Sequence, residues 1–179
     1  MSEWHVALLR GINVGTAKRV AMADLRALVE SLGYGDVKTL LNSGNVVFTT
    51  SAAKGRKAGA RIEQALREQL GVSSRVFLLN RADMDTIVEE NSLLPRVTNS
   101  SKMFVSMLAD PADITKLHTI VRQSWEPDAV QLGARAAYVW CENGLSQSKL
   151  AEVVLRALGT GVTTRNWATM LKLQAITSS

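Results

Sequence analysis

The sequence predicts an α+β protein of two ferredoxin-like subdomains, covering residues 1–95 and 96–179. Three observations lead to this fold. Apolar residues alternate between strand-like and helix-like spacing in the order β-α-β-β-α-β from residue 5 to residue 79, which is the order of a ferredoxin-like unit. The same order begins again at residue 103, after a polar segment. Glycine and proline stand at the ends of the expected elements in both halves.

Apolar spacing and turn residues define the elements of the first half. The first strand is apolar almost throughout, as is typical of a central strand. The first helix ends at Gly33, and Asn42-Ser43-Gly44-Asn45 is a strong turn between two strands. The expected elements are a strand at 5–9, a helix at 22–32, strands at 36–41 and 46–49, a helix at 62–70 and a strand at 75–79.

A further helix connects the halves. Asn80 is a suitable N-cap, and the helix ends near Asn91, with Pro95 confirming the break. The polar segment from Arg96 to Lys102 then joins the first half to the second.

The second half repeats the element order without repeating the sequence. We expect strands at 103–108, 129–132 and 136–141, a helix after Asp110-Pro111, and a helix capped by Ser146 or Ser148. Its last strand is expected to be missing and replaced by a helix, which Thr163 or Thr164 would cap and which carries Trp167.

Composition describes an ordinary folded protein. Apolar residues make up 46% of the 179 residues, and only three are proline. The single cysteine, Cys141, excludes an intrachain disulfide and is expected in the core. No signal-like N-terminus and no apolar run near the roughly 20 residues of a membrane span is found, so we expect a cytoplasmic protein that makes no contact with a membrane.

The net charge of +5 and the pI of about 9.7 leave two interpretations. One is a basic surface without a specific role, and the other is an anionic partner such as a small molecule or a nucleic acid. The densest cations, Lys54, Arg56, Lys57 and Arg61, are expected on a solvated helix face.

Topology predicts a polar site at one end of the first sheet. In a ferredoxin-like unit the loop after the first strand and the hairpin between the second and third strands share one end of the sheet. Arg10 to Gly15 should therefore lie beside Asn42 to Asn45. The glycine spacing of the first loop matches neither the P-loop nor the dinucleotide-binding motif, so only backbone N–H groups and a nearby arginine remain as anion-binding features.

Two segments in the second half also carry polar residues, at Ser148-Lys149 and at Arg165-Asn166-Trp167. Both are expected to open helices. A cation in the first turn opposes the helix dipole, and an adjacent anion would explain it; an ordinary surface charge is the alternative.

Catalytic groups are sparse in these segments. No carboxylate or histidine lies in any of the four, which argues against acid–base catalysis. His5 and His118 have no metal-binding spacing, so no metal and no cofactor are expected.

The same segments carry a family resemblance. The chain resembles the bacterial family numbered 1697 among the domains of unknown function, through residues 8–15, 42–46, 148–150 and 164–167, with Met22, Leu25-Arg26 and Leu171-Lys172-Leu173. The resemblance implies two ferredoxin-like subdomains and no particular activity. One departure is Thr16, where the family often has a glycine.

Three functional hypotheses follow. The first is a binding module for an anionic ligand: a nucleotide, a phosphate or a nucleic-acid backbone. The second is an enzyme acting on a phosphorylated or carboxylated small molecule, with catalytic residues unknown. The third is a polar cluster that only joins the subdomains. The oligomeric state stays open, with a monomer favoured. The predicted ligand-binding residues are Arg10, Asn13, Asn42, Ser43, Asn45, Ser148, Lys149, Arg165, Asn166 and Trp167.

Overall fold

The computed structural model describes all 179 residues, which pack into two compact units. The first unit holds Met1–Met84 and Leu173–Ser179, and the second holds Asp85–Lys172. The division therefore falls inside α4 (Arg81–Glu89) and again inside α7 (Trp167–Thr177). The boundary between residues 95 and 96 stays a prediction of where one repeat of elements ends.

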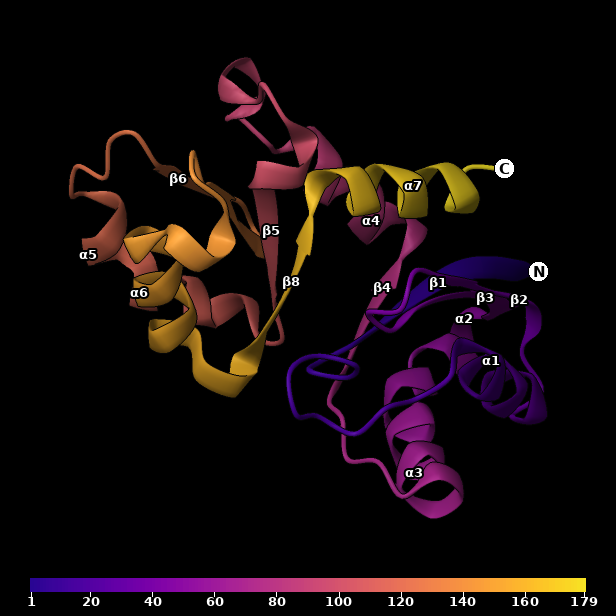
Figure 1. Ribbon diagram of the computed structural model, residues 1–179. Helices are drawn as coiled ribbons and strands as arrows, with labels where there is room; N and C mark the ends of the chain where they lie inside the picture. Colours follow the sequence, from indigo (N-terminus) through magenta and orange to yellow (C-terminus); the bar gives the residue numbers. More distant parts are fainter. The chain divides into compact units, whose positions relative to one another are not determined.

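The first unit is a four-stranded sheet in the order β2-β3-β1-β4, with every neighbouring pair antiparallel. Helices α1 and α3 cover one face of the sheet (Figure 1). The predicted β-α-β-β-α-β order is confirmed. Its elements are β1 (Ser2–Leu9), α1 (Met22–Ser31), β2 (Gly35–Leu40), β3 (Asn45–Ser51), the short α2 (Ala52–Gly55), α3 (Ala58–Leu70) and β4 (Val76–Asn80).

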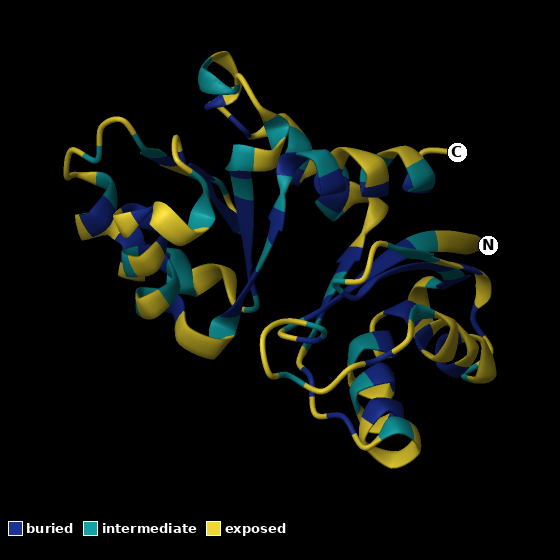
Figure 2. Ribbon diagram, in the orientation of Figure 1, coloured by how far each residue is buried: buried dark blue, intermediate teal, exposed yellow.

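Alternation along β1 builds the core of the first unit. Ala7 and Leu9 pack with residues of α1 and α3 such as Leu25 and Ile62, all fully buried. The outer faces of these helices remain exposed (Figure 2). Burying each large apolar side chain contributes about 1.5–3 kcal/mol, so the contacts on this face of the sheet stabilise the unit substantially.

The second unit repeats the architecture, with strand order β6-β7-β5-β8. Its core joins apolar residues of α6 to alternate residues of the sheet, such as Val139 and Val154. Its elements are β5 (Met103–Leu108), the 3-10 helix η3 (Pro111–Leu117), α5 (His118–Val121), β6 (Ala129–Leu132), β7 (Ala136–Trp140), α6 (Lys149–Leu158) and β8 (Val162–Asn166).

One part of the predicted fold is wrong: the second unit does have its last strand. Thr163 and Thr164 lie in β8, which pairs antiparallel with β5, and neither residue caps a helix. Both threonines are β-branched, which favours extended backbone, and Val162 before them adds to that preference. The second unit is therefore a complete β-α-β-β-α-β unit.

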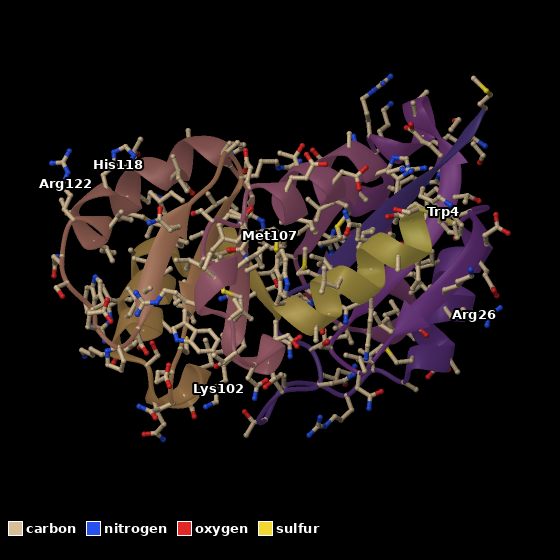
Figure 3. All side chains as sticks on the ribbon, turned by 90° about the horizontal axis from the view of Figure 1, so that it is seen from above. Trp4, Arg26, Lys102, Met107, His118 and Arg122 are labelled. Carbon is tan, nitrogen blue, oxygen red and sulfur yellow. The ribbon has the colours of Figure 1, made fainter.

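Shorter elements complete each unit. The 3-10 helices are η1 (Leu94–Arg96), η2 (Ser100–Lys102), η4 (Leu145–Gln147) and η5 (Gly159–Gly161). In the first unit, Trp4 lies beside the end of α7, and its indole Nε1 donates to the carbonyl of Ser179 at 3.4 Å (Figure 3). In the second unit, the Tyr138 hydroxyl donates to the carbonyl of Ile87 at 2.5 Å, which fixes the end of α4. No helix combines the length and apolarity needed to cross a membrane.

Candidate functional site

Three loops meet at one end of the first sheet, and we call them the basic rim: residues 10–21, 41–44 and 71–75. Backbone hydrogen bonds join them, because Leu9 N–H donates to the carbonyl of Gly44 at 2.8 Å and Arg10 N–H donates to the carbonyl of Arg75 at 2.9 Å. The predicted proximity of the first loop and the hairpin is thereby confirmed.

Asn13 ties the first loop to the hairpin. Its Nδ2 donates to the carbonyls of Val20 and Asn42, each at 2.8 Å, and its Oδ1 accepts from Val20 N–H at 2.7 Å. The residue has a φ of 54°, a left-handed conformation that asparagine tolerates. Both amide hydrogens are thus used inside the protein, and only part of the side-chain oxygen's capacity remains for a ligand.

The two asparagines of the hairpin differ: one is buried and holds the loop, and the other is exposed. Asn45 is fully buried, and its Nδ2 donates to the carbonyl of Leu40 at 2.8 Å and to Ser43 Oγ at 2.9 Å. Asn42 is exposed, and its carbonyl accepts from Asn13. Gly44 is obligatory, because a Cβ there would lie 2.8 Å from Leu9 Cβ and from Ile12 Cδ1.

The first loop offers backbone donors. Positive φ values recur at every second residue, at Gly11 (69°), Asn13 (54°) and Gly15 (52°). None of the backbone N–H groups from Gly11 to Thr16 donates a hydrogen bond within the protein. Successive N–H groups in such alternating conformations form concavities that bind anions.

Four cations and no carboxylate lie in the basic rim, which gives it a formal charge of +4. Lys18 Nζ donates to the carbonyls of Leu70 and Gly71, at 2.8 and 3.2 Å, and thereby caps α3. Arg19 donates to the carbonyl of Asn13 at 2.7 Å, and the exposed guanidinium of Arg75 lies 5.5 Å from the ring centre of Phe77. Of the four cations, only Arg10 is among the residues predicted from the sequence.

The other three cations could have been found from the sequence. The topology that joins the first two loops also places the start of β4 at this end of the sheet. Lys18, Arg19 and Arg75 would then have been counted together with Arg10.

The second unit forms the same junction from different residues. Leu108 N–H donates to the carbonyl of Arg135, and Ala109 N–H to the carbonyl of Gly161, each at 2.9 Å. Arg10 and Arg75 are therefore matched in position by Ala109 and Gly161. The corresponding loops, 109–117, 133–135 and 159–161, hold two acidic and two basic residues and so have a formal charge of zero.

Ser148 is the N-cap of α6, one of the two predicted alternatives. Its Oγ accepts from Ala151 N–H at 3.0 Å and donates to Asp128 Oδ2 at 2.6 Å. The hydroxyl thus both donates and accepts a hydrogen bond within the protein, and the side chain is buried. Cys141 is also buried, as predicted, and burial raises the pKa of its thiol to about 11.

Lys149 has a partner of its own. Its Nζ lies 3.0 Å from Glu152 Oε2 in the first turn of α6, and Glu152 also pairs with Arg156. The hydrogen bond from Lys149 and the nearby Arg156 lower the pKa of the Glu152 carboxyl. Of the two explanations left open for Lys149, this contact favours an ordinary surface charge, because an acidic residue in the same turn offsets the cation. Lys149 and Ser148 also line an open groove of about 760 Å³ beside α6.

Arg165 lies in β8 and not in the first turn of a helix, which corrects its predicted position. Its Nη1 donates to Thr163 Oγ1 and to the carbonyl of Thr164, each at 2.9 Å, and burial lowers its pKa to about 10. Asn166 Oδ1 accepts from Thr169 N–H at 2.9 Å at the start of α7, and Trp167 is buried. Arg10 and Arg165 belong to different units, so a shared cleft stays a prediction.

The histidines do not form a metal centre. No three His, Cys, Asp or Glu side chains are placed to hold a metal ion. His118 and Arg122 extend outward from the region of α5 (Figure 3).

The comparisons agree with this architecture. The family described as "Protein of unknown function (DUF1697)" matches residues 1–138. The chain belongs to this family. Within the DUF1697 match lie the basic rim and its counterpart loops as far as residue 135. No curated protein matches the chain. The solved structure of a conserved bacterial protein from Streptococcus pneumoniae is similar, with a TM-score of 0.78 and 22% identity over 99% of each chain, which shows a common fold.

Proposed function

We propose that the basic rim binds a phosphate-bearing anion. The observation that supports this is the contrast between the two junctions: the same backbone contacts are made with Arg10 and Arg75 in the first unit and with Ala109 and Gly161 in the second. These backbone contacts therefore form with or without an arginine side chain at either position. Four cations without a carboxylate in the same loops give the basic rim a formal charge of +4, which suits a ligand of opposite charge.

Two kinds of donor would act together. The guanidinium groups of Arg10 and Arg75 match phosphate oxygens in charge and in geometry. The N–H groups of Gly11 to Thr16 would supply directional hydrogen bonds to the same oxygens. Asn42 stands exposed beside them as a further polar contact. Asn13 and Asn45 act indirectly, since they hold the loops in place.

Binding, rather than catalysis, is the function that these residues favour. The three loops of the basic rim contain no histidine, aspartate or glutamate, and so have no side chain suited to transfer protons near neutral pH. A site of this composition can hold and orient an anion by charge and hydrogen bonding.

The test is a binding titration with a fluorescently labelled single-stranded oligonucleotide and, separately, with a nucleoside triphosphate. The variant Arg10→Ala/Arg75→Ala should bind at least about tenfold more weakly, because each charge-assisted hydrogen bond is worth about 1.5–3 kcal/mol. For the oligonucleotide, the slope of log affinity against log salt, taken between about 50 and 200 mM, should decrease by about 1 for each cation removed from a phosphate.

A matched control removes the same charge from the second unit. Arg122→Ala/Lys172→Ala changes two exposed cations outside the basic rim. Equal weakening by both double variants would show that only net charge matters, and the proposal would then be wrong.

A further inference from the structure

A second pocket lies at the opposite end of the first sheet from the basic rim. It has a volume of about 350 Å³ and is lined by Glu3, His5, Gly55, Arg56, Asn80 and Asp83 among others. His5 and Asn80 are direct partners across β1 and β4. The volume lies at the lower end of the roughly 300–1,000 Å³ of small-molecule sites, so the pocket has room for a small ligand only.

The imidazole of His5 is held rigidly in the wall of this pocket. The ring stacks on Phe48, with centroids 5.7 Å apart and planes 14° from parallel. The backbone of α2 also packs close to the ring, because a Cβ at Gly55 would lie 2.1 Å from His5 Nε2. Only glycine at residue 55 leaves the ring in this place.

Hydrogen bonding assigns roles to the two ring nitrogens. His5 Nδ1 lies 3.2 Å from the backbone carbonyl oxygen of Glu3, and because a carbonyl only accepts, Nδ1 carries the hydrogen in the neutral ring. Nε2 is then the acceptor. It lies 3.7 Å from Glu3 Oε1, so a hydrogen donor near Nε2 would meet the carboxylate as well.

The opposite wall is also fixed. Asn80 N–H donates to Asp83 Oδ2 at 3.0 Å, and Asp83 N–H donates to Asn80 Oδ1 at 2.8 Å, a reciprocal pair that opens α4. The Asn80 Nδ2 group makes no hydrogen bond in the protein. The exposed guanidinium of Arg56 likewise has no carboxylate partner, so it is available to a carboxylate from outside.

The charges select the class of ligand. Two carboxylates, Glu3 and Asp83, and one guanidinium, Arg56, give the pocket a formal charge of −1 with both signs present. Phosphate-bearing anions, with two or more negative charges, are disfavoured by the pair of carboxylates. A small molecule with an ammonium group and a carboxylate group matches both signs.

We propose that this pocket binds a free amino acid. Its carboxylate would pair with Arg56, and its ammonium group would donate to His5 Nε2 and the Glu3 carboxylate. The side chain of a basic amino acid would meet the second carboxylate, Asp83, so lysine and arginine should bind more tightly than glutamate. This site is independent of the basic rim in residues, charge and ligand.

The chain has two histidines, one in the pocket and one in the second unit, so binding at the pocket can be followed separately by NMR. Imidazole NMR signals of the full chain are followed during titration with L-arginine, L-lysine, L-glutamate and a nucleoside triphosphate. The His5 signals should shift saturably with the basic amino acids, while those of exposed His118, in the second unit, stay in place. Arg56→Ala and Glu3→Gln should each weaken binding about 10-fold to 100-fold, the range expected for one charge-assisted hydrogen bond.

Lys57→Ala is the matched control, because it removes an adjacent exposed cation that does not line the pocket. Melting temperatures of all three variants should equal that of the unchanged protein, since each altered side chain is exposed. The proposal is overturned if no amino acid shifts His5, if the nucleoside triphosphate alone does, if both histidines shift together, or if Lys57→Ala weakens binding as much as Arg56→Ala. Loss of binding at the basic rim would leave this result unchanged, so the two proposals fail separately.

Discussion

The two units form the same junction at one end of their sheets and give it different charges. In each, the N–H groups at the end of the first strand donate to the hairpin and to the residue just before the last strand. The loops around that junction carry a formal charge of +4 in the first unit and zero in the second. The topology thus fixes the backbone geometry of the junction. The side chains at the same positions differ between the two units, so they can serve a function that only one unit has.

The loops also differ in length and in how they are held. Twelve residues, 10–21, separate β1 from α1, and the amide of Asn13 fixes them. In the second unit Pro111 begins η3 almost at once, and Asp110 Oδ1 caps it by accepting from Ala112 N–H at 2.9 Å. A long loop fixed by its own polar side chains is a common form of binding loop.

Among substitutions that test how the loops of each unit are held, the largest loss of stability is expected at Gly44. Gly44→Ala places a methyl group 2.8 Å from two buried side chains and requires a φ of 81°, so the free energy of unfolding should fall by about 3 kcal/mol. Gly11→Ala is the control, because its φ is also positive but the space around it is open, and it should cost only about 1 kcal/mol. Urea unfolding measures both, and equal losses would mean that packing at the hairpin is not tight.

A smaller effect is expected at Asn13. Asn13→Ala removes three hydrogen bonds to backbone groups and should lower the free energy of unfolding by about 2 kcal/mol. Asn42→Ala alters an exposed side chain of the same rim and should stay within about 0.5 kcal/mol. If Asn13→Ala were equally harmless, the loop would not depend on this residue.

In the second unit, the corresponding test is a substitution of Ser148, the N-cap of α6. Ser148→Ala removes the acceptor for Ala151 N–H and the donor to Asp128, so a loss of about 1–2 kcal/mol is expected in urea unfolding. Ser146→Ala changes an exposed serine two residues earlier and should have no effect beyond about 0.5 kcal/mol. A similar loss from both would show that the cap is not specific to Ser148.

The smallest effect is expected at Lys149. Lys149→Gln removes one of two cations paired with Glu152, and all three side chains are largely exposed. The urea midpoint should not move measurably, because water and salt screen such pairs. A clear loss of stability would indicate that the pair is more than a surface contact.

Prediction from the sequence succeeded where local pattern and topology agree. The spacing of Leu25, Leu28 and Val29 predicted α1, and the turn residues 42–45 predicted the hairpin beside the first loop. It failed at β8, because Thr163 and Thr164 suit a helix cap and a strand equally, and only pairing with β5 decides between them. The full set of rim cations is not predicted, because the expected first loop covers only Arg10 to Gly15 and so excludes Lys18 and Arg19, and because Arg75 comes from a loop far along the chain. A site at His5 is not predicted either, because nothing in the sequence shows that α2 packs against its ring.

The division inside α7 has a consequence for the order of assembly. Residues 85–172 of the second unit are continuous, so all of its residues are present once residue 172 has been translated. The first unit includes Leu173–Ser179, and its Trp4 donates to Ser179. Although its strands are translated first, the first unit is completed only after the second has been synthesised.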